Sequence, residues 1–307
     1  AAVYEQVQAA YDAYNVLTYE QQAQINGADI FDDLFAVFNS ATNALATINN
    51  VSYLDEDCDQ QTANNVTVVE STTTSWGEGW YVVSTSVSIS SRITVTGEVH
   101  LILADGNTLT ASAGITVAQG NSLTIYCQQG GTGTLNAGGT STPGNYAGIG
   151  GKWNIASPTT PGTGGTITIN GGNVTAQGGT YGAGIGGGNA GAVGSVTING
   201  GTVTAIGGAG STGIGGGYGG GGGTITINGG TVTATANSGN SSSQNCAGIG
   251  GGWSGNGGTI TINGGTVTAT GSGTGAGIGR GSSSNVVAVG SCSITGDAVV
   301  FATGGDS

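Results

Sequence analysis

Residues able to do acid–base chemistry are few in this chain, and most lie in its first third. The 307 residues include 16 Asp and Glu but one histidine, His100, and no carboxylate stands between positions 106 and 296. Only Glu98, His100 and Asp105 lie close together, and Asp105-Gly106-Asn107 is typical of a turn. General acid–base catalysis needs a cluster of such groups on one face. We therefore predict that the protein is not an enzyme and has no catalytic residues.

Metal ligation is not indicated either. The acidic run at 55–59 lacks the glycine and the terminal glutamate of a calcium loop, so we interpret it as a solvated acidic turn. No cysteine has a zinc-binding spacing or lies near the histidine, and we predict no metal and no cofactor. In an oxidising compartment four cysteines allow three disulfide pairings, which the sequence leaves open. These cysteines are Cys58, Cys127, Cys246 and Cys292.

Aromatic residues recur at a fixed place in the second half of the chain. A Gly-Ile-Gly triplet occurs five times there. The residue four positions after its isoleucine is, in order, Trp153, Asn189, Tyr218, Trp253 and Ser282. Aromatic faces in a row stack against sugar rings, so Trp153, Tyr218 and Trp253 are candidate polysaccharide-binding residues. The alternative is that they shield glycine backbone or fill a contact with another protein.

The charge balance restricts the partners. Three Lys and Arg against 16 Asp and Glu give a formal net charge of −13, which excludes nucleic acid and anionic membranes as favoured partners. No run of 18 or more apolar residues is present, so we predict no membrane span. The start at Ala1-Ala2, without methionine, is typical of a chain whose signal peptide has been removed. We therefore expect a secreted protein, extracellular or at the cell surface.

One element repeats openly in the second half. It reads Ile-Thr-Ile-Asn-Gly-Gly, one variable residue and Val-Thr-Ala, and it begins at Ile167, Val196, Ile225 and Ile260 with spacings of 29, 29 and 35 residues. The Gly-Ile-Gly triplets keep the same register. The unit is thus 29 residues long, and its insertions are loops that leave the side of a repeating body.

Alternation within the unit gives three short faces, Ile-Thr-Ile, Val-Thr-Ala and Gly-Ile-Gly, separated by glycine-rich corners. Coils stacked about 4.8 Å apart would pair every strand with its equivalents above and below. This predicts an all-β right-handed parallel β-helix with three faces per coil. An inward isoleucine row would form the core. An asparagine row would occupy the first corner, where asparagine tolerates left-handed geometry and can bond to the asparagine of the next coil, and the following Gly-Gly would supply the other positive φ angles. The rows are Ile169, Ile198, Ile227 and Ile262, and Asn170, Asn199, Asn228 and Asn263.

The chain divides into four predicted segments. Residues 1–52 have helical periodicity and predict a small N-terminal α-helical module. Residues 53–79 form a polar linker or first cap, 80–146 form irregular β-helix coils, and 147–307 form the regular glycine-rich repeats. In the terminal coil we expect Cys292 at an inward position equivalent to Ile260, either as a buried thiol or bonded to Cys246. Phe301 is expected to fill space at the end.

A family resemblance supports this interpretation. The Gly-Ile-Gly-Gly and Thr-Ile-Asn-Gly-Gly-Thr-Val-Thr-Ala units, preceded by residues 99–109, resemble the pectin-lyase-like β-helix region of large surface proteins of Gram-positive anaerobes. Residues 11–25 are similar to helical modules of the same proteins, some of which are labelled carbohydrate-binding. The resemblance implies a β-helix fold and a cell-surface location, and it is weak for activity.

Three functions fit these features. A β-helix with uncapped ends presents unpaired strand edges that bind another copy. The leading hypothesis is therefore a non-enzymatic, self-associating fibre or stalk subunit, joined head to tail or from the N-terminal module to a neighbour's solenoid. The second is a polysaccharide-binding adhesin that uses the aromatic row. The third is ice binding through outward threonines, since flat threonine arrays order water; one such row is Thr168, Thr197, Thr226 and Thr261.

Overall fold

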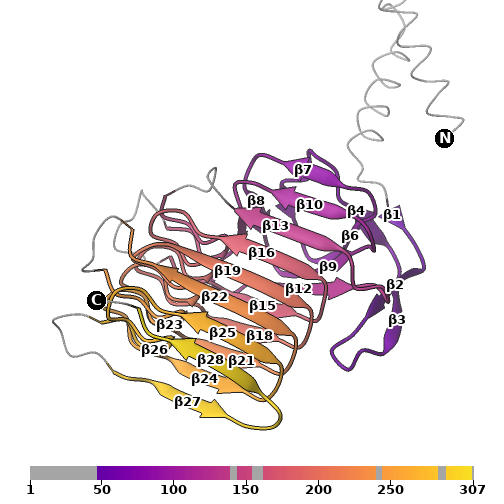
Figure 1. Ribbon diagram of the computed structural model, residues 1–307. Helices are drawn as coiled ribbons and strands as arrows, with labels where there is room; N and C mark the ends of the chain where they lie inside the picture. Colours follow the sequence, from indigo (N-terminus) through magenta and orange to yellow (C-terminus); the bar gives the residue numbers. More distant parts are fainter. Residues whose placement is uncertain (1–46, 139–143, 154–161, 240–243, 283–287, 306–307) are drawn as a thin grey trace, which may run out of the picture. The chain divides into compact units, whose positions relative to one another are not determined.

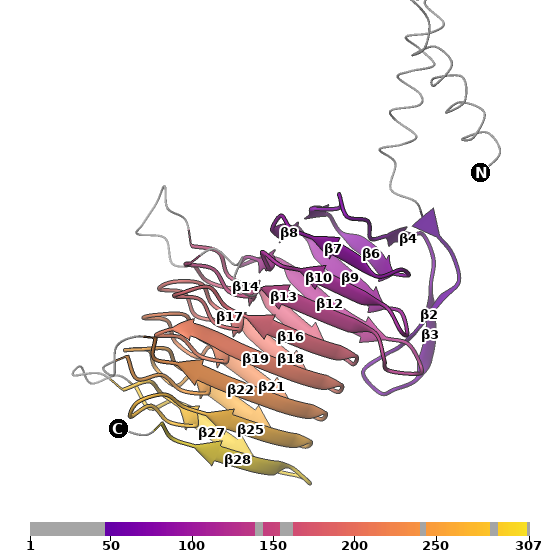
Figure 2. The same ribbon diagram turned by 45° about the horizontal axis from the view of Figure 1, so that its top comes forward.

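The computed structural model describes residues 47–138, 144–153, 162–239, 244–282 and 288–305. The description begins at residue 47, which is also where the second of the two units of the chain begins. Most of the predicted helical module at 1–52 therefore lies outside the described residues. Every regular element within the described residues is a β-strand. These strands wind into coils that stack along one axis (Figure 1; Figure 2).

Three sheets form the faces of the solenoid, and a hairpin lies beside them. The first sheet contains, in spatial order, β1 (Thr47–Ile48), β4 (Val66–Val68), β6 (Gly79–Val83), β9 (Glu98–Leu103), β12 (Ser122–Cys127), β15 (Thr166–Ile169), β18 (Ser195–Ile198), β21 (Thr224–Ile227), β24 (Thr259–Ile262) and β27 (Ser291–Ile294). The second contains β7 (Val87–Ile89), β10 (Thr108–Ala111), β13 (Thr134–Gly138), β16 (Asn173–Gln177), β19 (Thr202–Ala209), β22 (Thr231–Asn237), β25 (Thr266–Thr270) and β28 (Val299–Thr303). The third contains β5 (Ser75–Trp76), β8 (Ile93–Val95), β11 (Ile115–Val117), β14 (Ile149–Gly150), β17 (Ile185–Gly186), β20 (Ile214–Gly215), β23 (Ile249–Gly250) and β26 (Ile278–Gly279). The hairpin pairs β2 (Val51–Leu54) with β3 (Gln60–Ala63).

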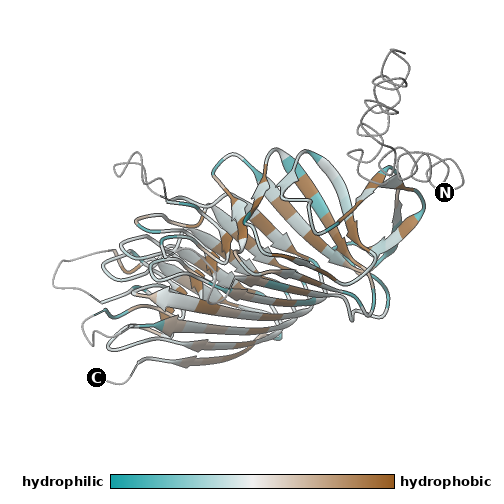
Figure 3. Cartoon of the chain, turned by 90° about the horizontal axis from the view of Figure 1, so that it is seen from above, coloured by the Kyte–Doolittle hydropathy of each residue, from teal (hydrophilic) through white to brown (hydrophobic). Residues whose placement is uncertain are grey.

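Successive coils pair in parallel and in register, which confirms the predicted parallel β-helix. Ile169 pairs with Ile198, Ile198 with Ile227, and Ile227 with Ile262, and all four side chains are fully buried. The threonine before each of them faces outward because side chains alternate along a strand. Apolar segments recur along the stacked strands (Figure 3).

The asparagine row forms a continuous chain of side-chain hydrogen bonds at the first corner. Asn199 Nδ2 donates to Asn170 Oδ1 at 2.8 Å, and Asn228 and Asn263 continue the chain at 2.7 and 2.8 Å. The expected left-handed geometry of these asparagines is wrong. The positive φ falls on the second glycine after each asparagine, as at Gly201 with φ of 83°, and the asparagines themselves are not among the residues with positive φ.

The N-terminal boundaries differ from the sequence prediction. Residues 47–52, assigned to the helical module, include β1 and the start of β2, because Thr47, Ile48 and Val51 are β-branched and find strand partners. Residues 53–79, assigned to a linker or first cap, contain most of the β2–β3 hairpin and the strands β4 and β5. Their polar composition reflects the exposed face of short strands, as in β3.

The two ends of the solenoid are unlike each other. At the N-terminal end β1 lies antiparallel on β4, and the fully buried Trp76 stacks on Tyr81 with ring centroids 5.4 Å apart. At the C-terminal end nothing among the described residues covers the last coil. Ile294 occupies the inward row yet is 51% exposed, and Phe301 is 58% exposed. Phe301 pairs with Thr268 and therefore faces outward, so its predicted role of filling the end is wrong.

One of the three cations binds backbone carbonyls at a corner of the solenoid. The Arg92 guanidinium donates to the carbonyls of Ala113, Ile115 and Ala147 and to the Thr116 hydroxyl, at 2.7 to 3.1 Å. Burial lowers the pKa of Arg92 to about 10, while proximity to Tyr146 opposes the shift. The side chain thus satisfies carbonyls at a corner where the strands of the third sheet are short.

The isoleucine row allows a matched test of how stacking stabilises the fold. We expect Ile227→Ala to lower the free energy of unfolding by about 2–5 kcal/mol, because the cavity would be enclosed by coils on both sides. Ile294→Ala removes the same atoms from the same row, but water already reaches Ile294, so its cost should be roughly half or less. Denaturant unfolding followed by circular dichroism measures both. Equal losses would contradict stacking as the source of stability.

Candidate ligand groove

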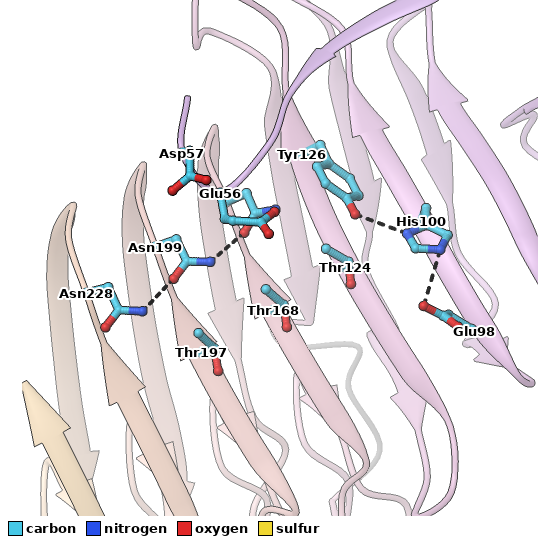
Figure 4. A pocket seen from close by; sticks show the side chains of 11 residues that line it. Glu56, Asp57, Glu98, His100, Thr124, Tyr126, Thr168, Thr197, Asn199 and Asn228 are labelled. Atoms are coloured by element: carbon cyan, nitrogen blue, oxygen red, sulfur yellow. Dashed lines mark hydrogen bonds and ion pairs between the residues drawn. The ribbon is translucent and has the colours of Figure 1, made fainter. Parts of the chain in front are cut away.

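A groove of about 690 Å³ lies between the turn of the β2–β3 hairpin and the outer face of the first sheet (Figure 4). Its floor is built from successive coils, which present hydroxyls and amides in two parallel rows. The floor residues are Thr124, Thr168 and Thr197, and Asn170, Asn199 and Asn228. Because the coils are in register, these polar groups repeat at the coil spacing of about 4.8 Å.

The hairpin is held over the sheet by an aromatic and apolar contact. Val82 and Ile102 face outward from the first sheet, yet both are buried, because the hairpin packs on them. The Tyr53 ring lies 4.7 Å from Trp80 and 4.8 Å from Tyr126, measured between centroids. The hairpin covers this apolar patch on the early coils, and its turn therefore lies beside the polar rows of the coils that follow.

The acidic turn of the hairpin forms one wall of the groove. Glu56 and Asp57 line it, and Asp55 organises the turn by accepting hydrogen bonds from the backbone N–H groups of Asp57 and Asp59. Hydrogen bonds, first of all from Gln61, lower the pKa of Asp55. The acidic run forms an exposed turn, as expected, and the side chains of Glu56 and Asp57 line the groove.

His100 is the centre of the other wall. Its Nε2 lies 3.5 Å from Glu98 Oε1, its Nδ1 lies 3.1 Å from the Tyr126 hydroxyl, and its ring stacks on Trp80 with centroids 4.4 Å apart. Burial lowers the pKa of His100, with Glu98 opposing, and burial raises the pKa of Tyr126 to about 12. A neutral imidazole between a carboxylate and a protonated phenol fits this geometry, and both ring nitrogens already have partners.

Asp105 does not join Glu98 and His100. Its carboxylate accepts hydrogen bonds from the backbone N–H groups of Gly130 and Thr132 at 2.8 and 3.0 Å, so it fixes a turn between coils. Glu56, Asp57 and Glu98 are the carboxylates of the groove, and no Lys or Arg lines it. The groove therefore favours neutral or cationic polar ligands and disfavours anions.

The predicted aromatic row is partly assembled. Tyr218 and Trp253 stack with centroids 4.9 Å apart and planes at 27°, and Tyr181 contacts Tyr218 edge-on at 5.0 Å. No ring contact joins Trp153 to this stack among the described residues, since Asn189 stands at the intervening corner. Sequence reasoning missed Tyr181, which precedes a Gly-Ile-Gly isoleucine instead of following one. Each ring of the stack is partly exposed.

The cysteines occupy four different environments, and all are free thiols. Cys246 is buried, and burial raises its pKa to about 12. Cys292 pairs with Ile260 in register, as predicted, but its expected burial is wrong, because no coil among the described residues covers it. Cys58 is exposed in the hairpin turn, and Cys127 is buried at the end of β12.

The threonine rows are in register. Thr168 pairs with Thr197, Thr197 with Thr226, and Thr226 with Thr261. Ice binding by these rows stays a prediction.

Neither a membrane-spanning helix nor a metal-ligand cluster is found among the described residues. No helix there is long and apolar enough to cross a membrane, and no group of three or more His, Cys, Asp or Glu side chains is placed to hold a metal ion.

Comparison with known proteins identifies the repeats. A family model described as a beta helix repeat matches residues 167–189, 196–218, 225–253 and 260–279. The repeat region is thus a parallel β-helix by sequence as well as by structure. No curated protein and no solved structure matches the chain.

His100 is the single histidine of the chain, so its titration can be followed without assignment. We expect proton NMR to give a pKa below 6.5, and Glu98→Gln to lower it further because the carboxylate favours the imidazolium. Since the folded-state pKa is depressed, the stability linked to His100 is present above pH 6.5 and is lost as the pH falls. A pKa at or above 6.5 would contradict the neutral imidazole between Glu98 and Tyr126.

Proposed function

We propose that this chain is a non-enzymatic structural protein of the cell exterior, which self-associates through the C-terminal end of its solenoid into a fibre or stalk. The proposal includes right-handed winding, because parallel strand connections are right-handed in about 98% of cases. It also includes the surface location implied by the resemblance to pectin-lyase-like surface proteins.

The exposed last coil carries the proposal. Four large apolar side chains, Val289, Ile294, Val299 and Phe301, are 48 to 68% exposed there. The strands β26, β27 and β28 are the outermost members of their sheets and offer unpaired edges. An apolar surface beside free strand edges supports association with another β-structure.

A second copy is the proposed occupant of this end. The opposite end is closed in the described residues by β1 and Trp76, so it offers a poorer match to the open coil. Two arrangements follow. The N-terminal residues 1–46 of one copy can bind the open end of the next, which would continue into a fibre, whereas two open ends that meet face to face would stop at a pair.

A structural function agrees with the state of the acid–base groups. His100 has both ring nitrogens engaged, and Asp105 is bound to backbone N–H groups. The regular repeats carry no carboxylate between residues 106 and 296. These observations support the absence of catalysis.

A matched pair of double variants tests the association. Val299→Glu with Phe301→Glu places two charges on the exposed last coil. Thr202→Glu with Thr204→Glu places two charges on equivalent outward rows of β19, within the body. We expect the first pair to weaken self-association at least tenfold, since charges must be desolvated at the contact, and the second to leave it unchanged.

Light scattering over a wide concentration range, with negative-stain imaging, gives the readout. A wild-type chain that stays monomeric throughout would remove the proposal. Equal assembly of both variants would exclude the C-terminal end as the contact.

Polysaccharide binding is the second candidate function, and the stack of Tyr181, Tyr218 and Trp253 favours it. Three adjacent aromatic rings on successive coils form an extended surface for sugar rings. The net charge of −13 and the carboxylates of the groove favour a neutral glycan over an acidic one.

We expect Trp253→Ala to weaken binding of a neutral oligosaccharide about tenfold, through loss of one stacked ring. Trp153→Ala serves as a control, because Trp153 lies outside the stack and its loss should matter less. Glycan-array screening followed by calorimetry measures both effects. Unchanged affinity in the Trp253 variant would exclude the stack as the binding surface.

A further inference from the structure

Two of the four cysteines face the same small cavity. Cys58 lies in the turn of the β2–β3 hairpin, and Cys127 ends β12 of the first sheet. Both line a cavity of about 200 Å³ together with Leu54 and the glycines of the first corner. The hairpin contact described above therefore places two thiols, 69 positions apart in the sequence, at one spot on the surface of the solenoid.

Both cysteines occupy constrained positions, Cys58 through its backbone conformation and Cys127 through its neighbour in the next coil. Cys58 adopts a left-handed conformation with φ of 65°, which is uncommon for cysteine and directs the turn at 55–59. Cys127 stands two residues beyond Ile125, which pairs with Ile169, so it occupies the place that Gly171 has in the next coil. A side chain at Gly171 would overlap the Cys127 sulfur, so the glycine leaves room for that sulfur.

We propose that Cys58 and Cys127 form a disulfide that fastens the β2–β3 hairpin to the corner of the solenoid. The bond would fix the acidic wall of the groove in place. Cys292 is a far less suitable partner. Cys292 lies on β27, five strands from β12 and thus about 24 Å away, whereas bridged Cα atoms lie within about 7 Å.

The chemistry needs an oxidant, for which oxidised glutathione or another small disulfide suffices. The exposed Cys58 thiolate attacks the small disulfide, forms a mixed disulfide and releases one thiol. The Cys127 thiolate then attacks the Cys58 sulfur, which forms the protein disulfide and releases the second thiol. Two protein thiols are oxidised and one small disulfide is reduced. Burial raises the pKa of Cys127, which suits the order with Cys58 reacting first.

The sparse cations of the chain make the pairing easy to assign. Trypsin cleaves after Arg92, Lys152 and Arg280, and the four resulting peptides contain one cysteine each. The full chain is incubated with oxidised glutathione, its remaining thiols are alkylated, and the digest is analysed by mass spectrometry. We expect peptide 1–92 to be linked to peptide 93–152, with a mass loss equal to two hydrogen atoms, and the link to disappear on reduction.

Variants separate this pairing from unspecific oxidation. Cys58→Ser and Cys127→Ser should each abolish the link, and the Cys127→Ser chain should instead retain glutathione on Cys58. Cys292→Ser removes another exposed cysteine and should leave the link unchanged. Wild-type chain in which Cys58 and Cys127 are both alkylated, or in which Cys58 pairs with another cysteine, would overturn the proposal.

A second readout tests the effect on the hairpin. A glutamate-specific protease cleaves after Glu56, which is exposed in the turn. We expect oxidation to slow this cleavage in the wild-type chain and reductant to restore it, while Cys58→Ser is insensitive to both. Cleavage at the same rate in both redox states would contradict the fastening of the hairpin.

Discussion

Each coil of this solenoid is stable because another coil lies against it in register. A single regular coil contributes strands of two to eight residues to the three sheets, too little chain to bury its own apolar side chains. Stacking places Ile198 and Ile227 between identical neighbours, where both are fully buried. Ile294 has the same side chain in the same row, but the described residues supply a neighbouring coil on one side only, and it remains half exposed. Stability is thus shared between neighbours and is lowest at an end without one.

The same register arranges the outer surface in lines. Outward residues of equivalent strands repeat at the coil spacing, so the threonines and asparagines form rows, and the amides of Asn170, Asn199 and Asn228 bond to one another along the axis. Rows of this kind suit extended partners, such as a polymer chain or another solenoid. The early coils depart from the pattern, because Val82 and Ile102 take outward positions and require the hairpin as a cover.

The charged residues also differ between the early coils and the regular repeats. The body has no carboxylate between residues 106 and 296, and the partly buried Arg92 donates to backbone carbonyls at a corner. The acidic side chains gather on the hairpin and the first coils, where they line the groove with His100. Among the described residues, the carboxylates and the histidine that line the groove lie in the N-terminal part of the solenoid, and four of the five exposed large apolar side chains lie at its C-terminal end.

The sequence by itself determined the repeating body. A period of 29 residues and strict alternation of apolar and polar residues bury Ile169, Ile198 and Ile227 together when successive coils stack in register. Only the tertiary structure decided the groove. Its walls come from Glu56, Glu98 and Tyr126, which belong to segments without a repeat, so no periodicity connects them in the sequence. The proximity of Cys58 to Cys127 depends on the same long-range contact of the hairpin. The exposure of Ile294 could not be predicted from the repeat either, since Ile294 fits the repeat as well as Ile262 does, and among the described residues only Ile262 has a coil on both sides.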